Sequence, residues 1–259
     1  MVGATASALH RTEAVMGTMV SLEVREPVVD PAAVDAAFDL LHDIDARFSP
    51  FKADSEITRL ANGEVAESDC SLDVRQVLAA CDHLAATTNG AFDARYHRSD
   101  GRLDPSGFVK GWALEEAGWL LETAGARNYW LNAGGDIVAR GEASPGKPWR
   151  VGIRHPHRPD RMAAVLGVRD RAVATSGAYE RGEHIVDPVS GVAPVGLRSV
   201  TVVGPGLAFT DAFATAIYVM GLPGLDWLAG EPDYAAFVIT DDDRSIWTPG
   251  MARYFEPEA

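Results

Sequence analysis

The stretch Tyr129-Trp130-Leu131-Asn132-Ala133-Gly134-Gly135-Asp136-Ile137-Val138-Ala139 decides the class of fold. Two short runs rich in aromatic and β-branched residues flank a pair of glycines, which permit backbone angles that other residues avoid. The pattern predicts two strands joined by a tight turn. Helical periodicity dominates the chain before this stretch, and short β-rich runs follow it. Because strands and helices do not alternate regularly, the sequence predicts an α+β fold with a largely antiparallel sheet and flanking helices.

The chain before this hairpin is predicted to contain one early strand and several amphipathic helices. Val20, Leu22 and Val24 alternate as in a half-buried strand. Asp30 can cap the next helix, with Pro31 in its first turn. Apolar residues recur at helical spacing in four segments, which run from Pro31 through Ile44, from Asp54-Ser55 to Asn62-Gly63, from Leu72 to Thr88 and from near Gly107 to Gly125.

The chain after the hairpin is predicted to form mostly strands. The exception is Asp211 to Met220, which has helical spacing. Because we find no internal repeat and no low-complexity linker, we expect residues 1–259 to form a single domain. The predicted strands are Trp149–Ile153, Val165–Gly167 and Ser199–Val203, followed by a closing hairpin of Tyr234–Thr240 and Arg244–Thr248.

Composition and charge exclude several classes of protein. With 259 residues, 47% of them hydrophobic, the chain can bury about 70–75% of its unfolded surface. Its net charge of -14 would repel a nucleic acid. No stretch reaches the ~18 apolar residues of a membrane span, and the N-terminus lacks both the apolar run of a signal peptide and a lipid-acceptor cysteine. We therefore expect a cytoplasmic protein, in which an anionic ligand would need a local cation or ordered amides.

An anion site is one interpretation of the segment Asp104-Pro105-Ser106-Gly107-Phe108-Val109-Lys110-Gly111. It places Ser, Gly and Lys where a helix begins, so that free backbone N–H groups and a cation could face an anion. The alternative is an ordinary capped helix with glycines for close packing. The segment is neither a GxxxxGK[ST] phosphate loop nor a GxGxxG dinucleotide turn, which argues against the common nucleotide-binding folds.

A metal site is one interpretation of Asp211 and Thr215. The two residues are four apart and would project from one face of a helix. Both offer oxygen, and Mg²⁺ needs only one or two protein oxygens when phosphates and waters complete its octahedron. The alternative is that Asp211 caps the helix while Thr215 bonds back to a carbonyl.

The segment from Ala174 to Pro188 concentrates hydroxyls, charges and a histidine in a predicted strand-loop-strand region. His184 is a natural general base because the unperturbed pKa of histidine lies near working pH. A nucleophilic triad built on Ser176 is the competing hypothesis. Ser176 lies in the sequence TSGAY, without the GxSxG elbow that projects a hydrolase serine, which argues against the triad.

In their order along the chain, these motifs resemble the ApbE family from Met16 to Met220. Met16-Gly17-Thr18 is similar to the N-terminal MGT of that family, and Phe48-Ser49-Pro50-Phe51 with Asp54 to Leu60 is similar to its aromatic-then-DSEI element. The further matches are Gly90-Ala91-Phe92-Asp93 to GAFD, Asp104-Pro105-Ser106-Gly107 with Lys110-Gly111 to D-x-S-x-x-x-K-G, Asn132–Asp136 to NxGGD, Ala174–Gly177 with Tyr179–Arg181 and His184–Pro188 to ATSG-x-YER…HIxDP, and Asp211 with Thr215 to D-x-x-x-T.

The resemblance implies a T-fold-like architecture and the activity of an FAD:protein FMN transferase. Such an enzyme uses Mg²⁺, transfers the FMN part of FAD to a Thr or Ser hydroxyl of an acceptor flavoprotein, and releases AMP. The metal ligands implied are Asp211, Thr215 and the carbonyl of Gly107, and the implied proton acceptor is His184, oriented by Asp187 or Glu180. The flavin-binding residues implied are Met16, Phe51 (stacked on the ring), Ala91, Phe92, Asp93, Asp104, Ser106, Lys110, Asp136, Thr175, Ser176, His184 and Ile185.

The sequence departs from the family pattern at three points. The segment 94–100 is short and basic where the family often has a Pro-Leu-rich stretch, which leaves that wall of the flavin pocket undefined. Ala214 stands where some relatives have an extra carboxylate beside the metal-binding Thr, so metal binding is expected to be weaker. The usual lipoprotein signal is missing.

Three rival functions stay open at this point. An FAD pyrophosphatase would use the same metal site but let water attack, so it would release FMN and AMP without an acceptor. A non-catalytic flavin carrier would hold intact FAD in the presence of Mg²⁺. A structural or interaction protein would bind no flavin and would leave the order of the motifs unexplained.

Overall fold

The computed structural model of the chain describes residues 8–26, 29–95, 102–177 and 185–256. Its centre is a sheet of eight strands in the order β1-β2-β3-β4-β7-β8-β9-β10, in which every neighbouring pair is antiparallel. Strands β5 and β6 form a second, two-stranded sheet. The strands are β1 (Leu9–Val15), β2 (Thr18–Val24), β3 (Tyr129–Ala133), β4 (Asp136–Arg140), β5 (Trp149–His155), β6 (Arg158–Val168), β7 (Arg171–Gly177), β8 (Leu197–Gly204), β9 (Ala235–Thr240) and β10 (Ser245–Trp247).

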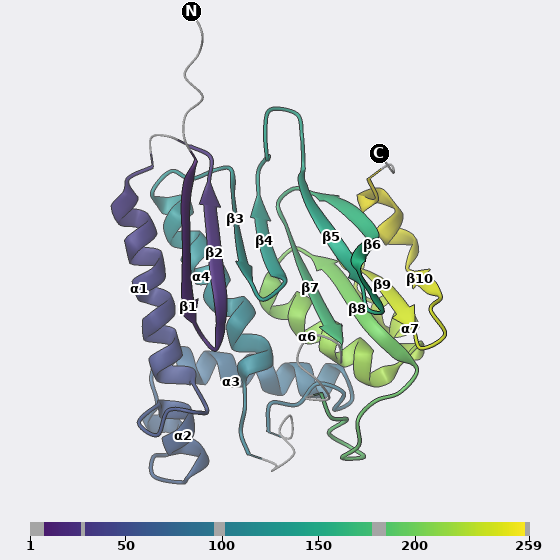
Figure 1. The fold of residues 1–259 in the computed structure, drawn as a ribbon. Coiled ribbons are helices and arrows are strands. Elements are labelled where there is room, and N and C mark those ends of the chain that lie inside the picture. Colours follow the sequence, from purple (N-terminus) through teal and green to yellow (C-terminus); the bar gives the residue numbers. More distant parts are fainter. Residues whose placement is uncertain (1–7, 27–28, 96–101, 178–184, 257–259) are drawn as a thin grey trace, which may run out of the picture.

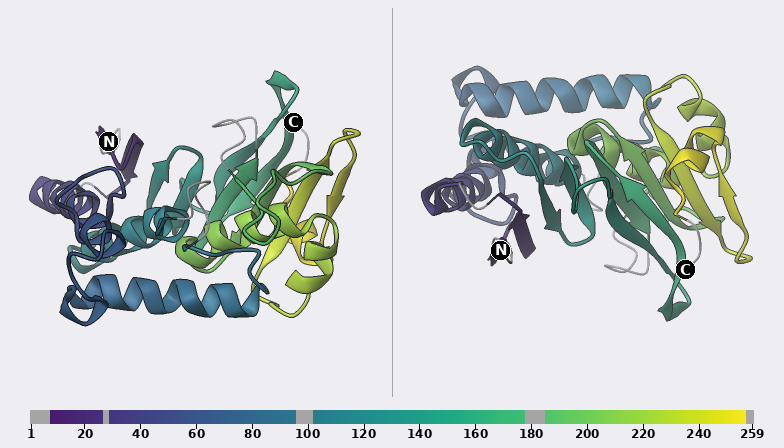
Figure 2. Two further views of the ribbon diagram at one scale, coloured as in Figure 1. Left: turned by 90° about the horizontal axis from the view of Figure 1, so that it is seen from below. Right: turned by 90° about the horizontal axis from the view of Figure 1, so that it is seen from above.

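Helices cover one face of the large sheet. In Figure 1, α4 and α6 lie behind the sheet and α1 lies at its left edge beside β1, while β5 and β6 lie in front of it. Both views of Figure 2 show α3 outermost on the helical side. Among the described residues, no helix is long and apolar enough to cross a bilayer. The helices are α1 (Pro31–Phe48), α2 (Glu56–Ala61), α3 (Leu72–Thr87), α4 (Ser106–Thr123), α6 (Leu207–Met220) and α7 (Pro223–Leu228), with short 3-10 helices at Glu67–Asp69 and Pro249–Tyr254.

These elements confirm the predicted α+β fold and its antiparallel sheet. The helix ends follow local chemistry, since the side chain of Asp30 accepts a hydrogen bond from the N–H of Ala32 at the start of α1. Ser55 caps α2 in the same way. The hairpin at Gly134-Gly135 also forms as predicted, with both glycines at positive φ. The closing hairpin of β9 and β10 is present as well.

Strand β1, helix α7 and the two short 3-10 helices were not predicted from the sequence. Strand β1 lies at the edge of the sheet and alternates exposed with partly buried residues before the buried Val15. Its partly buried positions include Arg11 and Glu13, so its apolar pattern is weak. It joins β2 through a two-residue turn in which Met16 and Gly17 both have positive φ, at 52° and 70°. Helix α7 is only six residues long, too short to give a periodic signal.

Two hydrophobic cores hold the layers together. The larger one lies between the sheet and the helices and includes Phe38, Leu114 and Val200. The smaller one fills the space between the other face of the sheet and the β5–β6 pair, and includes Trp149 and Phe237. The large sheet is therefore buried on both faces along much of its length, which explains the apolar run in β9 and the nearly continuous burial of β8.

Helices α4 and α6 approach each other closely at one glycine. A Cβ atom at Gly111 would lie 2.7 Å from backbone atoms of Leu207 and Ala208, closer than real Cβ contacts. Glycine is thus required here by the neighbouring helix, and its own φ is ordinary for a helix. This contact brings the side chains next to it on α4 and α6 within reach of each other.

We predict that Gly111→Ala destabilises the protein by about 1–3 kcal/mol, because overpacking against a backbone outweighs the ~1 kcal/mol that alanine gains in a helix. Chemical denaturation would measure the loss. Gly230→Ala is the matched control, since its new Cβ would lie at an ordinary 3.4 Å from the nearest atom, the carbonyl oxygen of Trp227. Equal or greater stability of Gly111→Ala would show that α4 can shift away from α6 at little cost.

Candidate functional site

Three charged side chains, from α4, β4 and α6, lie in contact on the helical side of the sheet. The ammonium of Lys110, on α4, contacts a carboxylate oxygen of Asp136, on β4, and lies 3.2 Å from Oδ2 of Asp211, on α6. Asp136 is 3% exposed and Asp211 is 4% exposed. Buried charges are rare in proteins unless they are paired or bind a ligand. We call this group the Lys110–Asp136–Asp211 cluster.

The turn before β4 fixes the position of Asp136. Gly134 and Gly135 adopt φ of 62° and 101°, and the N–H of Gly135 donates to the side-chain oxygen of Asn132 at 2.8 Å. Asp136 then starts β4, and its Oδ1 accepts a hydrogen bond of 3.1 Å from the N–H of Thr175 on β7. One carboxylate thus links the β4 hairpin, the neighbouring strand and Lys110.

Asp211 and Thr215 lie one turn apart on α6, and both are almost fully buried. Helix α6 begins at Leu207 with Gly206 as its N-cap, so Asp211 is in the second turn. The interpretation of Asp211 as a helix cap is therefore wrong. The hydroxyl of Thr215 lies 3.1 Å from that of Ser176 on β7, which brings a further candidate residue to the same place.

Glu115 was not found from the sequence, although it holds the start of α6. Its Oε1 accepts a hydrogen bond of 3.0 Å from the N–H of Ala208, and so binds the helix start as Asp211 would have done under the alternative interpretation. Burial raises the pKa of the Glu115 carboxyl, while the backbone N–H groups of Ala208 and Leu207 oppose that rise. A glutamate inside a helix is ordinarily exposed, so the spacing of α4 gave no signal for this contact.

The donors near the cluster suit a hard divalent cation. Asp211 offers a carboxylate and Thr215 a hydroxyl, and Gly107 lies one turn before Gly111 on the face of α4 that packs against α6. Among the described residues, no three His, Cys, Asp or Glu side chains converge as a metal site. A cation bound here would therefore complete its shell with water and ligand oxygens, as Mg²⁺ commonly does.

At the start of α4, a carboxylate of the protein binds a backbone N–H that the sequence interpretation offered to an anion. Oδ1 of Asp104 accepts hydrogen bonds from both the N–H and the hydroxyl of Ser106, the N–H at 3.0 Å. At least one N–H of the first helical turn is thus bound to the protein's own carboxylate. The cation of this segment, Lys110, is one turn further along α4, where it is paired with Asp136 and Asp211.

The other candidate flavin residues differ widely in exposure. Phe51 is 80% exposed, on the turn between α1 and α2, and its ring is accessible to a ligand. Phe92 is 1% exposed within the larger core, so it can shape a pocket wall but cannot stack on a ligand as it stands. Ala91 and Ile185 are buried, Met16 is partly buried in the β1–β2 turn, and Asp93 accepts a hydrogen bond from the N–H of Arg95.

The proposed catalytic pair lies only partly within the described residues. Asp187 stabilises the turn that follows it. Its carboxylate accepts hydrogen bonds from the hydroxyl of Ser190 at 2.6 Å and from the N–H of Val189 at 2.9 Å. The hydrogen bond from Ser190 lowers the pKa of Asp187. His184 and Glu180 lie outside the described residues, as does most of the basic segment, 96–100.

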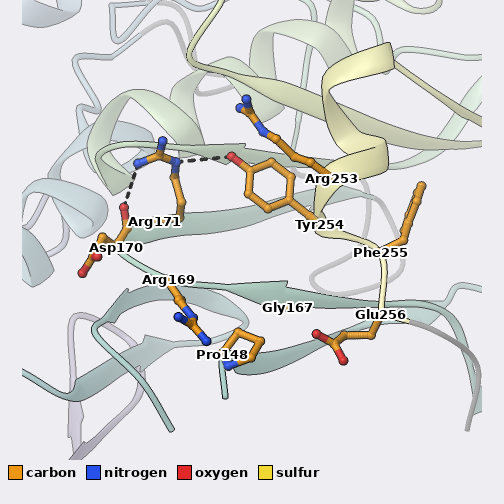
Figure 3. Close-up of a pocket in the computed structure, with 9 residues that line it drawn as sticks. All are labelled: Pro148, Gly167, Arg169, Asp170, Arg171, Arg253, Tyr254, Phe255 and Glu256. Atoms are coloured by element: carbon orange, nitrogen blue, oxygen red, sulfur yellow. Dashed lines mark hydrogen bonds between the residues drawn. The ribbon is translucent and has the colours of Figure 1, made fainter. Parts of the chain in front are cut away.

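A cavity of about 570 Å³ lies away from these residues. Figure 3 shows its lining, which comes from the start of β5, the turn between β6 and β7, and the C-terminal 3-10 helix. Its arginines are engaged in part, since Arg169 pairs with Glu142 at 2.6 Å and Arg171 donates to the hydroxyl of Tyr254 at 3.2 Å. Of the candidate flavin and metal residues within the described ranges, none lines this cavity, which is separate from the Lys110–Asp136–Asp211 cluster.

Known proteins similar to this chain point to one family. Curated relatives named FAD:protein FMN transferase include one from Haemophilus influenzae, 24% identical over 83% of this chain and 80% of the relative. Another, from Rhodobacter capsulatus, is 33% identical over 71% of this chain, and one from Vibrio cholerae is 31% identical over 62%. The aligned part spans only 36% and 50% of those two relatives.

Solved structures share the fold over almost the whole chain. The ApbE protein of Thermotoga maritima superposes with a TM-score of 0.85 at 21% identity, covering 96% of this chain and 100% of that one. The flavin transferase ApbE of Vibrio cholerae gives a TM-score of 0.84 at 22% identity, covering 96% and 99%. The sequence profile of the ApbE family matches residues 16–99 and 94–238, which include every residue of the cluster, and the chain therefore belongs to the ApbE family.

Proposed function

We propose that this chain is a transferase that moves the FMN part of FAD onto a Thr or Ser hydroxyl of an acceptor flavoprotein, with Mg²⁺ bound and AMP released. The observation that carries the proposal is the convergence of Lys110, Asp136 and Asp211 in a buried cluster. These residues come from three motifs far apart in the sequence. The names of the curated relatives support the same activity.

The charges of the site suit chemistry at a pyrophosphate. Bound at Asp211, Thr215 and the carbonyl of Gly107, Mg²⁺ would neutralise charge on the pyrophosphate. Lys110 adds a second positive charge one turn from Gly107 on the same helix. Because the protein carries a net charge of -14, this local positive potential is needed to hold FAD at all.

The transfer step exchanges a phosphoanhydride bond of FAD for a phosphoester bond to the acceptor. The acceptor oxygen forms a bond to the FMN phosphorus, the bond from that phosphorus to the bridging oxygen breaks, and AMP leaves with the bridging oxygen. We assign the hydroxyl proton to His184, with Asp187 or Glu180 orienting the imidazole. Phe51 would stack on the flavin ring, and the segments carrying Ala91, Thr175 and Ile185 would line the pocket.

Product analysis separates this function from its rivals. Purified protein is incubated with FAD and Mg²⁺, with and without an acceptor flavoprotein, and AMP and FMN are followed by chromatography. Transfer predicts AMP release that depends on the acceptor, with FMN recovered on the acceptor. Rapid release of free FMN without an acceptor would indicate a pyrophosphatase, and intact FAD in both reactions would indicate a carrier.

We predict that Asp211→Asn lowers the transfer rate by about 10²–10³-fold or more, the loss typical of removing one electrostatic contact to a transition state. The variant should still fold, as judged by circular dichroism, because Lys110 keeps its contact with Asp136. Thr215→Val should lower the rate more mildly, because it removes a neutral donor. Asp39→Asn, on the exposed side of α1, is the control for loss of one negative charge. A wild-type rate for Asp211→Asn across a Mg²⁺ titration would remove the metal site.

We predict that Phe51→Ala weakens FAD binding by about 1–3 kcal/mol through lost stacking area. The fold should be unaffected because the ring is mostly exposed. Flavin fluorescence titration measures the dissociation constant, and Trp119→Ala serves as a control at another exposed aromatic residue, 63% exposed on α4. If the two variants bind FAD equally well, Phe51 is not part of the pocket.

A further inference from the structure

Lys110 contacts the carboxylate that would hold the metal. Its ammonium lies 3.2 Å from Oδ2 of Asp211 and also contacts Asp136, so one ammonium group is paired with two buried carboxylates. A divalent cation bound by Asp211 would share that carboxylate with the ammonium of Lys110. Two positive charges a few ångströms apart repel strongly where solvent is largely excluded.

The backbones around the cluster have little freedom to relieve this repulsion. Asp136 is held by the N–H of Thr175, and Asp211 is held on a helix whose start is bound by Glu115. Gly111, next to Lys110, has no side chain, and α4 and α6 therefore pack closely at this point. The backbones that carry the three charges are therefore fixed, and only the flexible side chain of Lys110 can move.

The charge of the cluster changes sign when a divalent cation enters. Two carboxylates and one ammonium leave one net negative charge, and a divalent cation converts this to one net positive charge. A pyrophosphate diester carries two negative charges, and its arrival would make the site negative again. Uncompensated charge of either sign is costly in a buried site, so the cation and the pyrophosphate should stabilise each other there.

We propose that Lys110 couples the binding of the divalent cation to that of FAD, and this inference rests on the function proposed above. Lys110 competes with the cation for Asp211 when FAD is absent. When FAD is present, the ammonium leaves Asp211 for an oxygen of the pyrophosphate, and the cation gains the carboxylate. The lysine thus weakens binding of the cation alone and strengthens binding of the cation together with FAD.

Isothermal titration with Mg²⁺, without FAD and with saturating FAD in the absence of acceptor, measures this coupling. The FAD is checked for intactness by chromatography after each titration. For the wild-type protein we expect Mg²⁺ to bind about tenfold or more tightly when FAD is present, within the usual range of coupling between sites. For Lys110→Gln we expect Mg²⁺ alone to bind several-fold more tightly than to the wild type, by about 5-fold or more, and the coupling to fall.

Two further variants show whether the effect belongs to the cluster. Lys147→Gln removes the same charge from an exposed loop and should leave both Mg²⁺ affinities near those of the wild type. Asp136→Asn removes one of the two carboxylates that Lys110 contacts, so Lys110 should pair more strongly with Asp211 and Mg²⁺ without FAD should bind more weakly than to the wild type. Asp136→Asn is expected to change the Mg²⁺ affinity in the opposite sense to Lys110→Gln. It is therefore a sufficient test of the proposal if Lys110→Gln does not fold.

The outcomes separate this inference from the proposed function. If neither Mg²⁺ nor FAD binds to the wild-type protein, both the metal site and the proposed function fail. If both ligands bind, but Mg²⁺ alone binds to Lys110→Gln no more tightly than to the wild type, the coupling role of Lys110 is overturned while the function stands. Equal or tighter binding of Mg²⁺ alone to Asp136→Asn would overturn it in the same way.

Discussion

The ion pairs of Lys110 with Asp136 and Asp211 are the constraint on which the rest of the site depends. Taking charges out of water costs several kcal/mol for each ion, and the pairing offsets this cost only with good geometry. The fold supplies that geometry from three directions, with α4, β4 and α6 each contributing one side chain. Each of these elements is fixed by a separate local contact, at Gly111, at the Gly134-Gly135 turn and at Glu115. A stable fold and a charged site are therefore two results of the same packing.

The antiparallel sheet explains how motifs distant in sequence reach one place. Strands β4 and β7 are neighbours, so the acid that follows the glycine turn lies beside the Thr175-Ser176 pair of β7. Helix α6 packs on β7 and places Thr215 against Ser176. The larger core holds these contacts on the helical face of the sheet, whereas the cavity in Figure 3 belongs to the β5–β6 side. The two faces thus differ, with the Lys110–Asp136–Asp211 cluster on the helical side and the cavity on the other.

Much of the fold could be predicted from the sequence, because its helices have strong periodicity and clear caps at Asp30 and Ser55. Strand β1 could not, since an edge strand need not alternate clearly. For the site, the order of the motifs predicted Lys110, Asp136 and Asp211 as residues of one site, but no local pattern shows that they touch. Asp211 illustrates the limit, because its spacing from Thr215 was equally compatible with a cap until α6 was seen to begin at Leu207.

A crystal structure of the protein soaked with FAD and Mn²⁺ would test the central claim most directly, since anomalous scattering locates Mn²⁺ without ambiguity. Mn²⁺ prefers the same oxygen donors as Mg²⁺. We predict one anomalous peak at coordination distance from the side-chain oxygens of Asp211 and Thr215, with the pyrophosphate of FAD completing the shell and the ammonium of Lys110 on a phosphate oxygen. A flavin bound elsewhere, or a peak remote from Asp211 with Lys110 still bridging the two carboxylates, would contradict the account.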